Sequence, residues 1–189
     1  MAKAILLSIR PNWVKMILSK EKTFEIRKSF PKDYVGWVYI YATKGKKDHY
    51  LQEYKWQDNY PWKPDTEKGT CFRYSWIKSN DPVLNGKVVA RFWCDKVLTL
   101  THHKESIMEY WDYQNYPHLT YTTVKANIGL HELNKYAKGK TELLAIPITK
   151  LEIFENAKEL SDFKQTKKRY WFDKQVRKAP QNFLFVDIE

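Results

Sequence analysis

Hydrophobic and polar residues alternate along several short stretches of this chain, a pattern typical of β-strands. The alternation is clear over residues 4–9 and 23–28. Residues 37–42 place aliphatic side chains on one side and aromatic side chains on the other, which predicts the clearest central strand. Further strands are predicted over residues 71–77, 87–100, 141–154 and 183–188.

Three stretches have the spacing of short helices instead. One begins at Pro11 and ends near Ser19, and the missing N–H of a proline costs nothing in the first turn of a helix. The others are residues 105–111 and residues 130–137, the latter with Gly139 just past its end as a C-cap.

The order of these elements predicts an α+β fold, a small, mostly antiparallel β-barrel with short flanking helices. A length of 189 residues fits a single domain over residues 1–189. Pro147 in the predicted strand over residues 141–154 indicates an edge or a bulge. Residues 48–85 lose the alternation, and we interpret them as an aromatic-rich insertion packed on the domain, because a bare loop of that length is improbable.

Composition excludes several classes of protein. Hydrophobic residues make up 43% of the chain and charged residues 29%, which excludes a disordered chain. No apolar run is long enough to span a membrane or to form a signal-peptide core, so we predict a cytoplasmic protein with no membrane partner. The two cysteines, Cys71 and Cys94, cannot build a disulfide framework.

The sequence predicts no cofactor and no metal. Its six glycines are not spaced as a phosphate-binding loop. Its five histidines lack the spacing of zinc ligands, and the two cysteines are not a Cys-x-x-Cys pair. Cys94 lies in the middle of a predicted strand on an apolar face, and no serine has the context of a nucleophile elbow, which argues against nucleophilic catalysis by either residue type.

Charge favours a polyanionic partner. The chain has 33 Lys and Arg against 22 Asp and Glu, a formal net charge of +11. Aromatic residues reach 16% and alternate with basic ones at residues 54–56, 73–76 and 168–171. Proteins that bind single strands stack bases on such rings and hold the phosphates with Lys and Arg. The alternative is that most rings are core residues under an ordinary basic surface.

Residues 19–28 hold the most informative cluster of charges. Lys22 lies at the predicted turn between helix and strand, and Glu25 and Arg27 share one face of the strand. Two cations and a carboxylate are therefore predicted to converge, an arrangement that suits a phosphate and the edge of a base. The alternative is a surface ion pair between Glu25 and Arg27 that contributes under about 1 kcal/mol.

This segment resembles the N-terminal pattern of ASCH domains, relatives of the PUA RNA-binding fold. The pattern is a Leu-Ser-Ile-like strand, a short helix, Gly-x-Lys-x-x-Glu-x-Arg, and a Tyr-x-Tyr strand leading to a lysine. Lys20 replaces the glycine, and residues 179–183 are similar to the Pro-Gln-Ser-aromatic ending of the family. The resemblance covers residues 4–44 and about 129–189. The matching residues are Leu7-Ser8-Ile9, Lys22, Glu25, Arg27, Tyr39-Ile40-Tyr41-Ala42 and Lys44.

The resemblance implies a PUA-like barrel whose basic cleft binds RNA, another single-stranded nucleic acid or a modified nucleotide. Lys22, Arg27 and Lys44 would hold phosphate, Glu25 would accept hydrogen bonds from a base or orient Arg27, and Tyr41 would stack. Residues 164–178, with seven Lys or Arg against one Asp, either extend the contact to the backbone or form a solvated face. The predicted binding residues are Ser8, Arg10, Lys22, Glu25, Arg27, Tyr41 and Lys44.

Two other functions stay open. The first is an RNA-directed hydrolase that uses Lys22 and Glu25, either a ribonuclease or an amidohydrolase acting on modified nucleosides. The amidohydrolase branch of the family is thought to use a Lys, a Thr three residues later and a distant Glu, whereas here Glu25 and, in a loose alignment, Ala126 take the last two positions. The second is a protein-interaction module whose aromatic insertion, residues 50–76, docks a partner.

Overall fold

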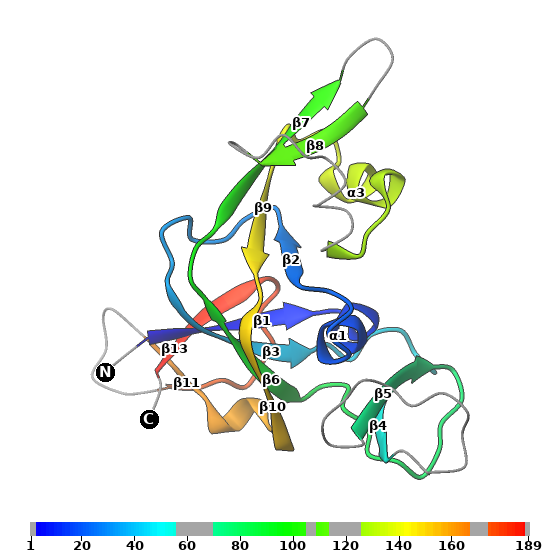
Figure 1. The fold of residues 1–189 in the computed structure, drawn as a ribbon. Coiled ribbons are helices and arrows are strands. Elements are labelled where there is room, and N and C mark those ends of the chain that lie inside the picture. The colour runs from blue at the N-terminus through cyan, green and yellow to red at the C-terminus, as the bar shows by residue number, and fades with distance from the viewer. Residues whose placement is uncertain (1–2, 56–69, 105–108, 114–125, 167–173, 188–189) are drawn as a thin grey trace. The chain divides into compact units, whose positions relative to one another are not determined.

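The computed structural model describes residues 3–55, 70–104, 109–113, 126–166 and 174–187 (Figure 1). Within these residues the protein is mostly β-sheet with two short α-helices and one 3-10 helix, so the predicted α+β class is confirmed. In chain order the elements are β1 (Lys3–Ile9), α1 (Pro11–Leu18), β2 (Phe24–Arg27), β3 (Gly36–Ala42), β4 (Tyr50–Lys55), β5 (Thr70–Ser75), β6 (Val88–Cys94), β7 (Leu98–Lys104), β8 (Glu109–Tyr113), α3 (Leu130–Ala137), β9 (Glu142–Pro147), β10 (Thr149–Lys158), the 3-10 helix η1 (Leu160–Asp162), β11 (Lys164–Gln165), β12 (Lys174–Gln175) and β13 (Phe183–Asp187).

The chain forms two compact units. The first unit comprises residues 1–20, 38–91 and 152–189, and the second comprises residues 21–37 and 92–151. The single domain over residues 1–189 stays a prediction. No helix in the described part of the chain is long and apolar enough to cross a membrane.

A seven-stranded sheet runs in the order β10-β6-β3-β1-β13-β11-β12. β1 pairs in parallel with β3 and antiparallel with β13, with Ile5 opposite Val38 and Phe185 respectively. Residues 4–7 of β1 are fully buried, which explains why this strand is apolar on both faces. Antiparallel pairing, which the sequence predicted to dominate, joins β11 to β12 and β13, β9 to β2 and β7, β7 to β8, and β4 to β5.

The second unit is built on a four-stranded sheet in the order β2-β9-β7-β8, with α3 beside it (Figure 1). Phe24 and Ile26 alternate along β2 and enter a core with Leu133 and Ala137 of α3. Trp111 of β8 is buried in the same core and donates a hydrogen bond from Nε1 to Asn134 Oδ1 at 2.6 Å. This core therefore holds one face of β2 in place.

Two predicted long strands are each two strands in different sheets, so these predictions were wrong. Residues 87–100 divide into β6 and β7 at the exposed, charged pair Asp95 and Lys96. Residues 141–154 divide into β9 and β10 after Pro147, which lacks the N–H that a sheet needs. Thr149 Oγ1 at the start of β10 donates a hydrogen bond to Trp93 O near the end of β6 at 2.7 Å, so the two points where the predicted strands divide lie close together.

The predicted helix at residues 105–111 is also wrong where it can be tested. Residues 105–108 lie outside the described residues, and residues 109–111 begin β8. On β7, His102 and His103 stack on Trp111 and Tyr110 across the strand pair, with ring centroids 4.8 and 4.9 Å apart. Such cross-strand pairs stabilise the antiparallel pairing over a short isolated helix.

The predicted insertion contains a hairpin of two strands, β4 and β5. β5 overlaps the predicted strand at residues 71–77, whereas β4 was not predicted from the sequence. Leu51, Cys71 and Phe72 are buried, and both strands pack near α1. Residues 56–69, which join the strands and carry part of the aromatic sequence, lie outside the described residues.

Candidate functional site

Three of the motifs noted in the sequence meet in the first unit. Ser8 lies opposite Tyr41 in the parallel pairing of β1 with β3. The Ser8 hydroxyl donates to Pro180 O at 2.7 Å, and the Ser8 N–H donates to Asn182 O at 3.0 Å. Ser8 is 6% exposed, so its hydroxyl ties the C-terminal Pro-Gln-Asn segment to the first strand. The structure thus gives this serine a structural contact.

An open cleft of about 590 Å3 lies next to this junction. Its exposed cations are Lys44, Arg177 and Lys178. The carboxylate in its lining, Glu159, has Oε1 3.3 Å from the ammonium group of Lys87. The cleft therefore keeps an excess of positive charge. Its lining residues are Tyr41, Lys44, Gly86, Glu159, Leu160, Ser161, Val176, Arg177, Lys178 and Ala179.

Tyr41 and Gly86 shape the wall of this cleft. Burial, with a smaller contribution from the charge of Glu159, raises the pKa of Tyr41, so its hydroxyl stays protonated at neutral pH and can donate a hydrogen bond. Only 3% of Tyr41 is exposed. Gly86 has a φ of +84°, a conformation that strains other residues, and its N–H donates to Ala42 O at 2.7 Å.

The second unit brings the three charged residues of the motif together, as the sequence predicted. Glu25 Oε1 lies 3.0 Å from Arg27 Nη2, and Glu25 Oε2 lies 3.7 Å from Lys22 Nζ. The side chains of Lys22, Glu25 and Arg27 are 2%, 7% and 11% exposed. This is a buried triad of charges and not the surface ion pair that was the alternative.

Lys22 has a further partner in the second unit. Its ammonium group donates to the backbone oxygen of Ala126 at 2.7 Å. Ala126 is the position that the loose alignment with amidohydrolases matched to a glutamate, and it contributes a carbonyl group here. Burial lowers the pKa of Lys22 and the charge of Arg27 adds to this, while Glu25 opposes it.

The predicted site residues divide between the two units. Lys22, Glu25 and Arg27 lie in the second unit and the other four lie in the first. Of those four, Tyr41 and Lys44 line the cleft, and Ser8 is the strand neighbour of Tyr41. Arg10 is exposed and is the N-cap residue of α1, where its carbonyl accepts a hydrogen bond from the N–H of Val14 at 3.0 Å.

Sequence reasoning missed part of the cleft. Arg177 and Lys178 belong to the basic stretch 164–178 that was noted as an extension, but Gly86 and residues 159–161 had no signal of their own. Burial raises the pKa of Cys94 to about 11, and the thiol contacts the backbone oxygens of Tyr34 and Lys96, which agrees with the argument against this cysteine as a nucleophile. Among the described residues, no three His, Cys, Asp or Glu side chains could hold a metal ion.

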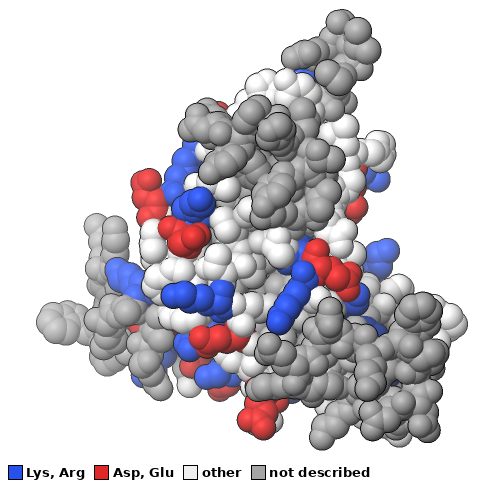
Figure 2. Space-filling view, viewed as in Figure 1, with Lys and Arg blue, Asp and Glu red and all other residues white. Residues whose placement is uncertain are grey.

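On the face of the protein shown in Figure 2, the described residues do not gather positive charge into one uniform surface. On the face shown in Figure 2, Lys and Arg side chains lie interspersed with Asp and Glu side chains across the described residues. A local excess such as that of the cleft therefore matters more than the net charge of the whole chain.

Only the comparison with solved structures finds proteins similar to this chain. No protein-family model and no curated protein sequence matches the chain. Among solved structures, it is similar to ASCH from Zymomonas mobilis, with 14% sequence identity, a TM-score of 0.53, and coverage of 97% of this chain and 87% of that one. A tyrosine-to-phenylalanine variant of the same protein gives 13% identity, a TM-score of 0.54, and coverage of 98% and 91%.

Two conclusions follow. The protein is of the α+β class with mostly antiparallel sheets and short helices. Its chain has the ASCH fold, which confirms the resemblance noted in the sequence, although few residues are identical.

Proposed function

We propose that this protein binds RNA, or another single-stranded nucleic acid or modified nucleotide, in the cleft of the first unit. The observation that carries the proposal is the set of exposed cations, Lys44, Arg177 and Lys178, around a cleft whose carboxylate already has a partner in Lys87. Exposed cations of this kind are suited to phosphate oxygens. The proposal includes the PUA-like barrel that the resemblance to ASCH domains implies.

The neutral groups of the cleft complement these cations. A volume of about 590 Å3 falls within the range of roughly 300–1,000 Å3 that small-molecule sites occupy, so one nucleotide fits. Because only 3% of Tyr41 is exposed, its ring is not open to the stacking expected from the resemblance, and we assign it instead a hydrogen bond from its hydroxyl to the sugar or base. Ser161 is exposed at the same rim and offers a second hydroxyl group.

The test is the affinity for a fluorescently labelled single-stranded RNA, measured by anisotropy at about 50 and 200 mM salt. We expect salt to weaken binding steeply, and Lys44→Ala to weaken it at both salt concentrations. Lys32→Ala is the matched control, because Lys32 is 63% exposed and belongs to the second unit. Absent or salt-independent binding would refute the proposal.

A second candidate, an RNA-directed hydrolase, is favoured by one observation. Lys22 is buried beside Glu25 and its pKa is lowered, a combination that is common at catalytic sites. Here Glu25 would act as the general base and Lys22 and Arg27 would stabilise negative charge. Labelled RNA and modified nucleosides incubated with wild type and Glu25→Gln separate the candidates, with circular dichroism confirming that the variant is folded. Turnover that the variant loses indicates an enzyme, and binding without turnover indicates a binding module.

A further inference from the structure

A short loop connects the cleft to the β4–β5 hairpin within the first unit. It begins at Lys44, which lines the cleft, and ends at His49, next to β4. Asn85 holds both ends: its Nδ2 donates to Lys44 O at 3.0 Å and to His49 O at 3.2 Å, and its Oδ1 accepts from the N–H of Leu51 at 2.6 Å. Asn85 therefore holds the loop in place between the cleft and β4.

This loop is basic and lies close to α1. Lys44, Lys46 and Lys47 are exposed, against one carboxylate at Asp48. Gly45 has a φ of +72°, and a Cβ atom there would lie 3.0 Å from the ring of Pro11. The three lysines are therefore exposed on a loop whose backbone packs tightly against Pro11 at Gly45, where the positive φ favours glycine.

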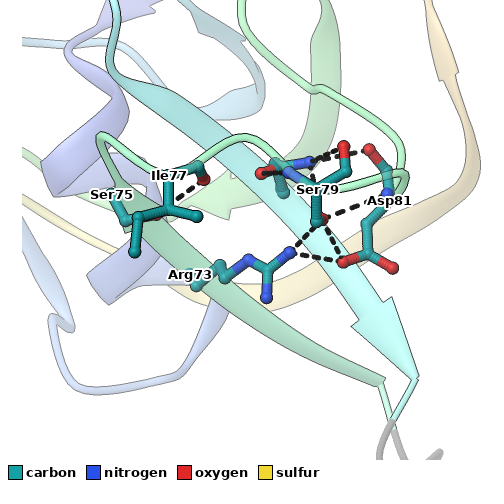
Figure 3. Close-up of polar contacts among 6 residues, drawn as sticks. Arg73, Ser75, Ile77, Ser79 and Asp81 are labelled. Atoms are coloured by element: carbon teal, nitrogen blue, oxygen red, sulfur yellow. Dashed lines mark hydrogen bonds and ion pairs between the residues drawn. The ribbon is translucent and has the colours of Figure 1, made fainter.

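Aromatic rings begin where the loop ends. The ring of His49 lies 5.6 Å from that of Tyr74 on β5. Just after β5, Trp76 is 72% exposed, and its neighbour Ile77 is 59% exposed. The Ser75 hydroxyl donates to Ile77 O at 3.0 Å, which closes the turn that carries Trp76 (Figure 3).

A polar network holds this turn against the hairpin. Arg73 pairs with Asp81 and also donates to the hydroxyl of Ser79 (Figure 3). Gln52, which is fully buried, donates from Nε2 to Asp81 O at 2.8 Å and accepts at Oε1 from the N–H of Ser79 at 3.3 Å. Both ends of the turn are thus tied down, so little conformational entropy is lost when a ligand binds to Trp76.

We propose that the ligand is a single-stranded RNA several nucleotides long, which runs from the cleft over the lysines of residues 44–47 to stack a base on Trp76. This deepens the proposed function and rests on it. Alternating cations and exposed rings are what a single strand recognises, whereas the bases of a duplex are stacked on one another. Lys78 supplies a further cation near the end of this path, with its ammonium group 5.7 Å from the ring centroid of Tyr50.

The experiment compares a labelled uridine dinucleotide with a uridine oligonucleotide of about 12 residues. Wild type is expected to bind the long strand at least about tenfold more tightly. Trp76→Ala should weaken binding of the long strand by about 5- to 100-fold and leave binding of the dinucleotide unchanged, while Trp76→Phe restores most of the loss. Ile77→Ala is the matched control, because it removes an exposed apolar side chain that cannot stack, and its binding should equal that of wild type.

The outcomes separate this inference from the proposed function. If wild type binds both lengths equally, or Trp76→Ala binds the long strand as tightly as wild type, the path over the hairpin is refuted and the cleft proposal stands. In the second case the exposed pair Trp76 and Ile77 is left as a surface for a protein partner, as predicted for the aromatic insertion. If neither RNA binds, the proposed function itself is refuted.

Discussion

The two groups of basic residues in this protein differ in what surrounds them. In the second unit, Lys22 and Arg27 are 2% and 11% exposed and share the carboxylate of Glu25. In the first unit, Lys44, Arg177 and Lys178 are exposed around an open cleft. The cations of the second unit are paired with a carboxylate inside the protein, whereas the cations of the first unit leave their charge to solvent or a ligand. A motif of charged residues therefore does not by itself identify the surface that a polyanion reaches.

This difference in burial implies that the cations of the second unit affect stability, whereas those of the first unit affect binding. Removing one member of a buried ion pair leaves a charge without compensation in a poorly solvated place, so it is costly. Removing an exposed lysine changes the free energy of unfolding little, because water already solvates its charge in the folded protein. Substitutions in the two groups should therefore change different measured quantities, and the three predictions below test this from the largest expected effect to the smallest.

The largest effect is expected for Glu25→Gln. This change leaves Lys22 and Arg27 buried without their carboxylate, and we expect the free energy of unfolding to fall by about 3–5 kcal/mol in urea titrations followed by circular dichroism. The control is Glu152→Gln, which removes a carboxylate 2.7 Å from Arg91 that is 47% exposed, and should cost under about 1 kcal/mol. Equal losses in the two variants would contradict the distinction between buried and exposed charge.

An intermediate effect is expected for the double variant Arg177→Ala/Lys178→Ala. The plot of log affinity for single-stranded RNA against log salt has a negative slope, which should become shallower by about 0.7 for each phosphate that the variant no longer neutralises, or about 1.4 in total. Stability should change by less than about 0.5 kcal/mol, because both side chains are exposed. Lys32→Ala/Lys140→Ala removes the same charge from exposed positions of the second unit and should leave the slope unchanged. Identical slopes in the two double variants would place the bound phosphates elsewhere.

The smallest effect is a pH dependence of stability from Lys22. Its pKa in the folded protein is below the ordinary value of 10.5, so between these two values the unfolded chain binds more protons at this position. The free energy of unfolding should therefore rise with pH across this window, and the contribution is complete above 10.5. Urea titrations at several pH values should show a flatter pH dependence for Lys22→Met than for wild type, whereas Lys32→Met should follow wild type. Parallel curves for wild type and Lys22→Met would mean that burial does not perturb this lysine.

The sequence by itself predicted the elements with strong local patterns. Alternation identified β1, β2, β3 and β13, and helical spacing identified α1 and α3. Predictions from local patterns were wrong where contacts between residues distant in the sequence determine the secondary structure. Residues 87–100 have the pattern of one strand, yet β6 and β7 belong to different sheets, and β8 forms because its rings stack on the histidines of β7.

The same division holds for the candidate site. Lys22, Glu25 and Arg27 lie within six positions of one another, so a turn followed by a strand was sufficient to bring them together. Their burial came from the tertiary structure, which also placed Ala126 against Lys22. The cleft joins Lys44, Gly86, Glu159 and Arg177, which no local pattern connects, because only the folding of the chain brings such distant residues together.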